Sequence, residues 1–71
     1  MMSTEEVKRN AITHLEAAKE FVMQAYVQAK LAAFDVKRIS DHETADSIIT
    51  TANDIKETAQ TLNDFIGFVE M

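Results

Sequence analysis

Apolar and polar positions alternate along the first half of the chain with the period of an amphipathic helix. From residue 11 to residue 39, apolar side chains recur at alternating steps of four and three residues. They are Ala11, Leu15, Ala18, Val22, Ala25, Ala29, Ala32, Val36 and Ile39. Because an α-helix makes about 3.6 residues per turn, this heptad spacing places them in one stripe, which we call the first seam. We therefore expect a helix over about residues 4–38.

The second half of the chain repeats this spacing and predicts a second helix over about residues 41–69. Its apolar stripe, the second seam, consists of Ala45, Ile48, Ala52, Ile55, Ala59, Leu62, Ile66 and Val69. Between the helices, Ser40 and Glu43 have the spacing of a capping box, in which each side chain bonds the backbone N–H of the other residue. A capping box favours a tight turn over one bent helix. The sequence thus predicts an antiparallel two-helix hairpin that forms a single domain, residues 1–71.

Polar residues at both ends of the first helix agree with these bounds. Ser3 or Thr4 can cap the N-terminus, and the acidic pair at 5–6 lies where the positive end of the helix dipole favours carboxylates. The basic pair at 37–38 falls in the last turn, where cations complement the carbonyl end.

Folding the chain back at residues 39–41 sets small side chains of the first seam against large ones of the second. Ala18 then lies opposite Leu62, and Ala25 lies opposite Ile55. Since interior packing density is reached by interdigitating unequal side chains, this register supports the antiparallel hairpin.

A further apolar stripe lies on the other side of the first helix. We call it the outer stripe, and it consists of Met23, Val27, Leu31 and Phe34. A helix that is apolar on two sides is buried on two sides, so we expect the hairpin to self-associate through these residues. The predicted assembly is an antiparallel dimeric four-helix bundle, with a tetramer as an alternative. The other interpretation is a groove for a helix of a foreign partner.

The composition agrees with an all-α protein. The 71 residues include no Cys, no Pro and one Gly, which leaves few residues for turns or a β-sheet. A chain this short buries a small fraction of its surface, so we expect it to need a partner chain. No apolar run reaches the ~18 residues that span a bilayer, and the N-terminus is acidic. We therefore expect a cytoplasmic protein without a signal peptide or membrane contact.

Charge is distributed unevenly between the two predicted helices. Six basic and five acidic residues precede Ser40, whereas seven acidic residues and one basic residue follow it. The two helices should therefore attract each other. The net charge of −5 argues against a general binder of nucleic acids or anionic membranes.

This pattern resembles the Rop family of plasmid copy-number regulators. The likeness lies in two heptad helices of this length, a tight polar turn, alternation of small and large residues along the second seam, and the acidic stretch Asp41 to Asp46. It covers about residues 4–69 as architecture. It implies a dimeric four-helix bundle that binds paired RNA loops through one face of its first helices. No RNA-binding residue of that family is carried over to this chain.

One face of the first helix is the best candidate for a binding surface. Lys8, Lys19, Lys30 and Lys37 follow one another at eleven, eleven and seven residues, which keeps them on one side with Tyr26 beside them. We predict that Lys19, Tyr26, Lys30 and Lys37 bind a partner. Two other interpretations stay open, namely ion pairs with acidic residues of the second helix and contacts with RNA phosphates.

The sequence carries no catalytic, cofactor or metal-binding pattern. His14 and His42 each lack a second His four residues on, and the pair Glu16 and Glu20 beside Lys19 is typical of a solvated helix face. No nucleophile, base and orienting group fall at a recognised spacing, and there is no glycine-rich phosphate loop. We therefore expect a protein that is not an enzyme and holds no cofactor or metal.

The sequence thus predicts a small oligomeric helical protein that acts by binding another protein. A regulatory or inhibitory role, of the kind found in phage or plasmid proteins, is the first hypothesis. One alternative is a Rop-like RNA-binding regulator that uses the face with the four lysines. The others are an acidic mimic of nucleic acid and a purely structural assembly unit.

Overall fold

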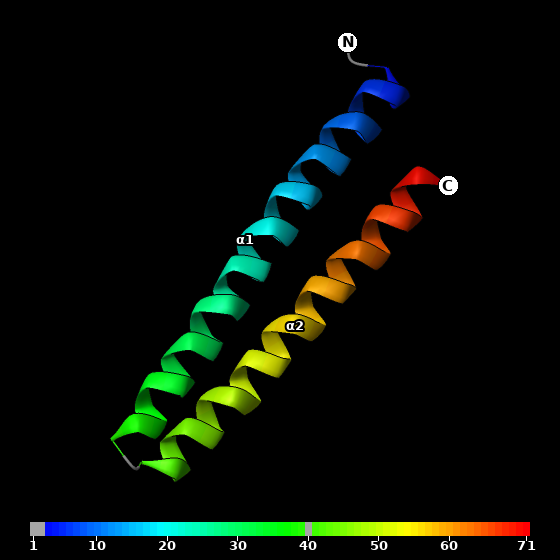
Figure 1. Ribbon diagram of the computed structural model, residues 1–71. Helices are drawn as coiled ribbons and strands as arrows, with labels where there is room; N and C mark the ends of the chain where they lie inside the picture. The colour runs from blue at the N-terminus through cyan, green and yellow to red at the C-terminus, as the bar shows by residue number, and fades with distance from the viewer. Residues whose placement is uncertain (1–2, 40) are drawn as a thin grey trace.

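Two long helices packed side by side make up the structure (Figure 1). The computed structural model describes residues 3–39 and 41–71. Helix α1 comprises Thr4–Arg38 and helix α2 comprises His42–Glu70, and the two run antiparallel. Within the described residues, neither helix is long and apolar enough to cross a membrane. The predicted all-helical hairpin is confirmed, and its helix bounds agree with the observed ones to within one residue.

A local hydrogen bond starts α1 where the sequence predicts. The Ser3 hydroxyl accepts a hydrogen bond from the Glu6 backbone N–H at 3.2 Å, which makes Ser3 the N-cap instead of Thr4. Acidic residues occupy the first turn, and basic residues occupy the last turn, where each charge complements the helix dipole. The first turns of α1 extend beyond the C-terminal end of α2 (Figure 1).

Helix α2 has a different N-cap from the predicted one. The Asp41 carboxylate accepts a hydrogen bond from the Thr44 backbone N–H at 3.1 Å, which makes Asp41 the N-cap. The predicted capping box gave this role to Ser40, which lies outside the described residues. Asp caps a helix as well as Ser does, and its negative charge is favoured at the helix N-terminus. The cap therefore lies one residue after the predicted position.

Alanines line the closest contact between the helices. The buried residues are Ala33, Ala45, Ala52, Ala59 and Ile66. The larger residues of α2 that belong to the same predicted stripe are only half-buried, and these are Ile48, Ile55, Leu62 and Val69. Small side chains at the contact let two helices approach closely, because packed interiors leave little empty space. The larger apolar side chains consequently lie beside the contact.

The side of α1 that faces α2 differs from the prediction in the second half of the helix. Ala25, Ala32 and Ile39 of the first seam are exposed, so α2 does not bury them in the single hairpin. Tyr26 is half-buried and Ala33 is buried in their place. A rotation of α1 about its axis by part of a turn accounts for the difference. Burying the Tyr26 ring removes more apolar surface from water than burying the methyl group of Ala25 would.

Candidate interaction surfaces

The outer stripe is exposed along its whole length. The exposed fractions are 38% for Met23, 50% for Val27, 53% for Leu31 and 57% for Phe34. The Arg38 guanidinium lies 5.1 Å from the centre of the Phe34 ring, within the range of a cation–π contact. A single hairpin therefore leaves open all four side chains that the sequence assigns to an oligomer interface.

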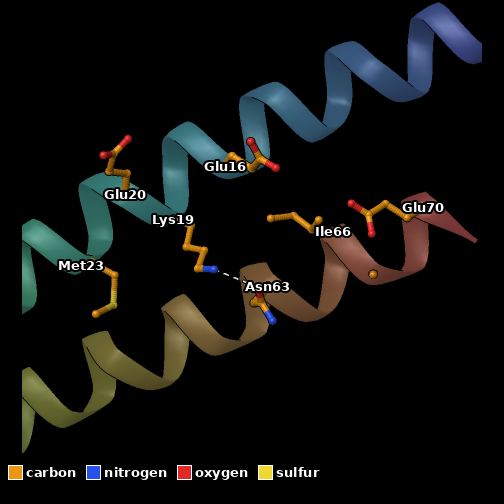
Figure 2. Close-up of a pocket in the computed structure, with 8 residues that line it drawn as sticks. Glu16, Lys19, Glu20, Met23, Asn63, Ile66 and Glu70 are labelled. Atoms are coloured by element: carbon orange, nitrogen blue, oxygen red, sulfur yellow. Dashed lines mark hydrogen bonds between the residues drawn. The ribbon is translucent and has the colours of Figure 1, made fainter.

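Lys19 joins the two helices instead of projecting freely into solvent. Its Nζ donates a hydrogen bond to Asn63 Oδ1 at 2.9 Å, and its side chain is half-buried between α1 and α2 (Figure 2). The acceptor is thus a neutral amide and not an acidic residue of α2. A partner that uses Lys19 must share the ammonium group with Asn63 or displace it.

Tyr26 lies close to two lysines that come from different helices. The Nζ atoms of Lys30 and Lys56 are 5.6 Å and 5.9 Å from the centre of the Tyr26 ring. Both distances fall within the ~6 Å over which a cation is attracted to an aromatic face. Tyr26 is half-buried, whereas Lys30 and Lys56 are exposed. The structure therefore places Tyr26 beside Lys30 and adds Lys56 of α2 to the predicted group.

These contacts define one flank of the hairpin, which we call the lysine flank. Its residues are Lys8, Lys19, Tyr26, Lys30, Lys37 and Lys56, which include every lysine of the chain. Lys8 and Lys37 belong to it because they lie near a whole number of helical turns from Lys19 and Lys30. Lys56 escaped the sequence prediction, since it is the one basic residue of an acidic helix. An antiparallel register places residue 56 close to Tyr26, and this register could have indicated that Lys56 joins the group.

A shallow groove adjoins the lysine flank near the C-terminal end of α2. It has a volume of about 610 Å³ and is lined by Glu16, Lys19, Glu20, Met23, Asn63, Ile66, Gly67 and Glu70 (Figure 2). Three carboxylates against one ammonium group make this groove unfavourable for a phosphate. Among the described residues, no three His, Cys, Asp or Glu side chains are grouped so that they could hold a metal ion.

A second exposed apolar surface lies on the flank away from the lysines. Phe21 and Ile39 of α1 are 71% and 76% exposed, and Phe65 of α2 is 48% exposed. Ala25 and Ala32 are exposed between Phe21 and Ile39. The sequence indicates extra apolar surface at Phe21 and Phe65, but it assigns Ala25, Ala32 and Ile39 to the contact with α2.

Comparisons of the chain with protein-family models, with curated proteins and with solved structures found no match. The fold and its surfaces define only a class, a helical hairpin with exposed apolar and basic flanks. Its function must therefore be inferred from those surfaces.

Proposed function

We propose that this chain is a self-associating, non-enzymatic protein that acts by binding another macromolecule, in a regulatory or inhibitory role. One observation carries the proposal. Within residues 3–39 and 41–71, the buried core consists of four alanines and one isoleucine, whereas ten large hydrophobic side chains are exposed. Extensive exposed apolar surface marks an interaction site.

The exposed surface is larger than a compact chain of this mass would have. The accessible surface is 5444 Å² for a mass of 8.0 kDa. A compact monomer of that mass exposes about 4,450 Å². The excess of roughly 1,000 Å² per chain is what each subunit contributes to a stable homodimer interface. The radius of gyration of 16.7 Å, against about 11 Å for a compact domain of this length, reflects the same open shape.

The proposed assembly is an antiparallel dimeric four-helix bundle of the Rop-like type, with both heptad seams facing its centre. Half-buried side chains of α2, such as Ile55 and Leu62, would then be covered by a second layer of helices. Two exposed apolar surfaces are available for this contact. One is the outer stripe, from Met23 to Phe34, and the other is the flank that contains Phe21.

The lysine flank is the proposed surface for a foreign partner. Lys30 and Lys37 present two exposed positive charges, and the half-buried Tyr26 ring presents aromatic surface beside them. Complementary charge steers association, and tyrosine is enriched in protein interfaces. An acidic protein surface is the partner that these residues suit best.

RNA is the second candidate partner, because every lysine of the chain gathers on one flank. The phosphate backbone of RNA is bound mainly by clustered basic side chains. Glu16, Glu20 and Glu70 surround Lys19, however, and lower the positive potential at that end of the flank. An acidic protein therefore ranks before RNA.

Self-association is tested by the absolute mass in solution, measured by light scattering on a sizing column over a wide dilution series. Circular dichroism on the same samples reports helicity. We expect a dimer that loses helicity as it dissociates, since the same apolar contacts stabilise the dimer and its helices. A fully helical monomer at every concentration would contradict this part of the proposal.

Partner binding is tested with a Lys30→Glu, Lys37→Glu double variant, which reverses two exposed charges and leaves the bond between Lys19 and Asn63 intact. The double variant Arg9→Glu, Arg38→Glu is the matched control, because it also reverses two exposed basic residues of α1, both outside the lysine flank. We expect wild-type and control protein to capture the same acidic protein, and the double variant to lose it. An RNA gel shift that weakens steeply with salt and is lost in the double variant would favour the RNA candidate. If wild-type protein captures no acidic protein and shifts no RNA, the proposal that the chain binds a foreign macromolecule is contradicted.

A further inference from the structure

The charged residues of α1 leave one side of this helix free of charge. At about 100° per residue, all its Asp, Glu, Lys and Arg side chains fall within one half of the helix circumference. Part of the other half faces α2. The rest carries Val7, His14, Ala18, Phe21, Ala25, Ala32 and, at the C-cap, Ile39.

Helix α2 has a similar uncharged side. Its acidic residues from Glu43 to Asp64 lie on the side turned away from α1, and Lys56 belongs to the lysine flank. The uncharged side next to the α1 contact carries hydroxyl residues and the apolar side chains of Ile48, Ile55, Leu62 and Val69. All four apolar side chains are half-buried. The exposed Phe65 marks the boundary of this side, because Asp54 lies eleven residues before it and so almost in line with it.

One contact shows that the uncharged sides of both helices share a flank. Tyr26 of α1 and Lys56 of α2 lie together on the lysine flank. On each helix the preceding residue lies about 100° away, across the line of contact. These preceding residues, Ala25 and Ile55, therefore lie on the opposite flank. We call this opposite flank, built from both helices, the charge-free face.

We propose that a second copy of this chain packs against the charge-free face. The inference rests on the proposed function, since it names the surface through which the chain self-associates. Burying this face removes no ionised side chain from water, and burying a charge is costly unless the charge is paired. The outer stripe is different, because the Arg38 guanidinium lies over the ring of Phe34, a member of the stripe. Burying the outer stripe would therefore take a charged group out of water.

The exposure of the first seam supports the same assignment. In a four-helix bundle each helix contacts two neighbours, and its core residues point between them. The first seam lies between the side of α1 that faces α2 and the charge-free face. A second hairpin on that face would therefore cover Ala25, Ala32 and Ile39, which are exposed on one hairpin. It would also complete the burial of Ile55 and Leu62.

This assignment changes which surfaces remain outside the dimer. The sequence assigned self-association to the outer stripe, from Met23 to Phe34. With the charge-free face occupied, the outer stripe and the lysine flank both stay on the outside of the bundle. They are then the surfaces that a foreign macromolecule can reach.

The experiment compares Ala25→Glu with Val27→Glu. Both variants place a carboxylate at an exposed position of α1, two residues apart, one on the charge-free face and one on the outer stripe. Light scattering at a concentration where wild type is dimeric should show Ala25→Glu at half the wild-type mass and Val27→Glu at the wild-type mass. Dissociation of Val27→Glu, alone or together with Ala25→Glu, overturns the assignment. A wild-type dimer that Ala25→Glu leaves intact overturns this inference alone, whereas a monomeric wild type overturns self-association itself.

Single cysteines provide a second measurement that does not depend on disrupting the fold. The chain has no Cys, so Ala25→Cys and Val27→Cys each introduce one unique thiol. At dimer concentrations the thiol at position 25 should react several-fold more slowly with a thiol reagent than the thiol at position 27, and dilution should remove the difference. Equal reactivity at both concentrations overturns the inference.

Discussion

At the scale of the residue, Asp41 decides where α2 begins. Hydrogen bonds from the backbone N–H and the hydroxyl of Thr44 hold the pKa of the Asp41 carboxyl below its ordinary value. The unfolded chain therefore takes up this proton more readily than the folded chain. Asp41 stabilises the fold fully above its unfolded pKa, and the contribution is lost as the pH falls through the lower, folded pKa.

We predict that Asp41→Asn makes folding less sensitive to acid. Asn caps a helix about as well as Asp but does not titrate. As the pH is lowered below about 4, the thermal midpoint of wild type should fall more steeply than that of the variant, as measured by circular dichroism. Asp41→Ala is the control and should lower the midpoint at every pH, because Ala cannot cap. Parallel curves for wild type and Asp41→Asn would show that the ionised carboxylate contributes nothing.

At the scale of the element, α2 depends on its packing against α1. Hydroxyl side chains of α2 repeatedly donate to the backbone carbonyl four residues earlier, as Thr50, Thr51, Thr58 and Thr61 do. Such bonds slightly destabilise a helix, and threonine has only moderate helix propensity. Gly67 adds the conformational entropy cost of glycine inside a helix. The buried alanines of the contact with α1 must offset these costs.

Gly67→Ala should stabilise the protein by about 1 kcal/mol, the difference in helix propensity between the two residues. A Cβ at this position meets nothing within 4 Å, so the substitution introduces no clash in the hairpin. Denaturant unfolding monitored by circular dichroism measures the change. Ala17→Gly, at an exposed position of α1, is the control and should lose a similar amount. Destabilisation by Gly67→Ala would mean that another chain occupies the space beside Gly67.

At the scale of the whole molecule, one hairpin is an incomplete core. The residues that it buries fully are alanines and one isoleucine among the described residues, and small side chains contribute little apolar burial. In the proposed dimer, contact with a second hairpin would supply much of the stability, and we therefore predict that stability rises with protein concentration.

Ile55→Ala tests this view of the core. In a bundle in which Ile55 is fully covered, the substitution should cost about 2–5 kcal/mol through the cavity that it leaves. Denaturant unfolding at a concentration where the protein is dimeric measures this cost. Thr50→Ala, on the exposed side of α2, is the control and should change stability by no more than about 0.5 kcal/mol. An equally small effect of Ile55→Ala would place Ile55 outside any packed core.

The helices and their approximate ends could be predicted because their causes are local. Apolar spacing near the helical period, Ser3 ahead of α1, and the basic pair at 37–38 all act within a few residues of the backbone that they influence. The hairpin followed from two such helices with a polar junction between them. The cap of α2 was misplaced by one residue, since Ser40 and Asp41 are adjacent residues of similar capping strength.

The sequence by itself therefore determined two amphipathic helices and an antiparallel hairpin. Only the tertiary structure decided the rotation of α1 about its axis. Helix α1 has apolar residues on more than one side, and the helical period alone does not determine which of these sides faces α2. That rotation half-buried Tyr26 beside Lys56 and left Ala25, Ala32 and Ile39 exposed. The choice depends on contacts between residues far apart in the chain, which no local spacing encodes.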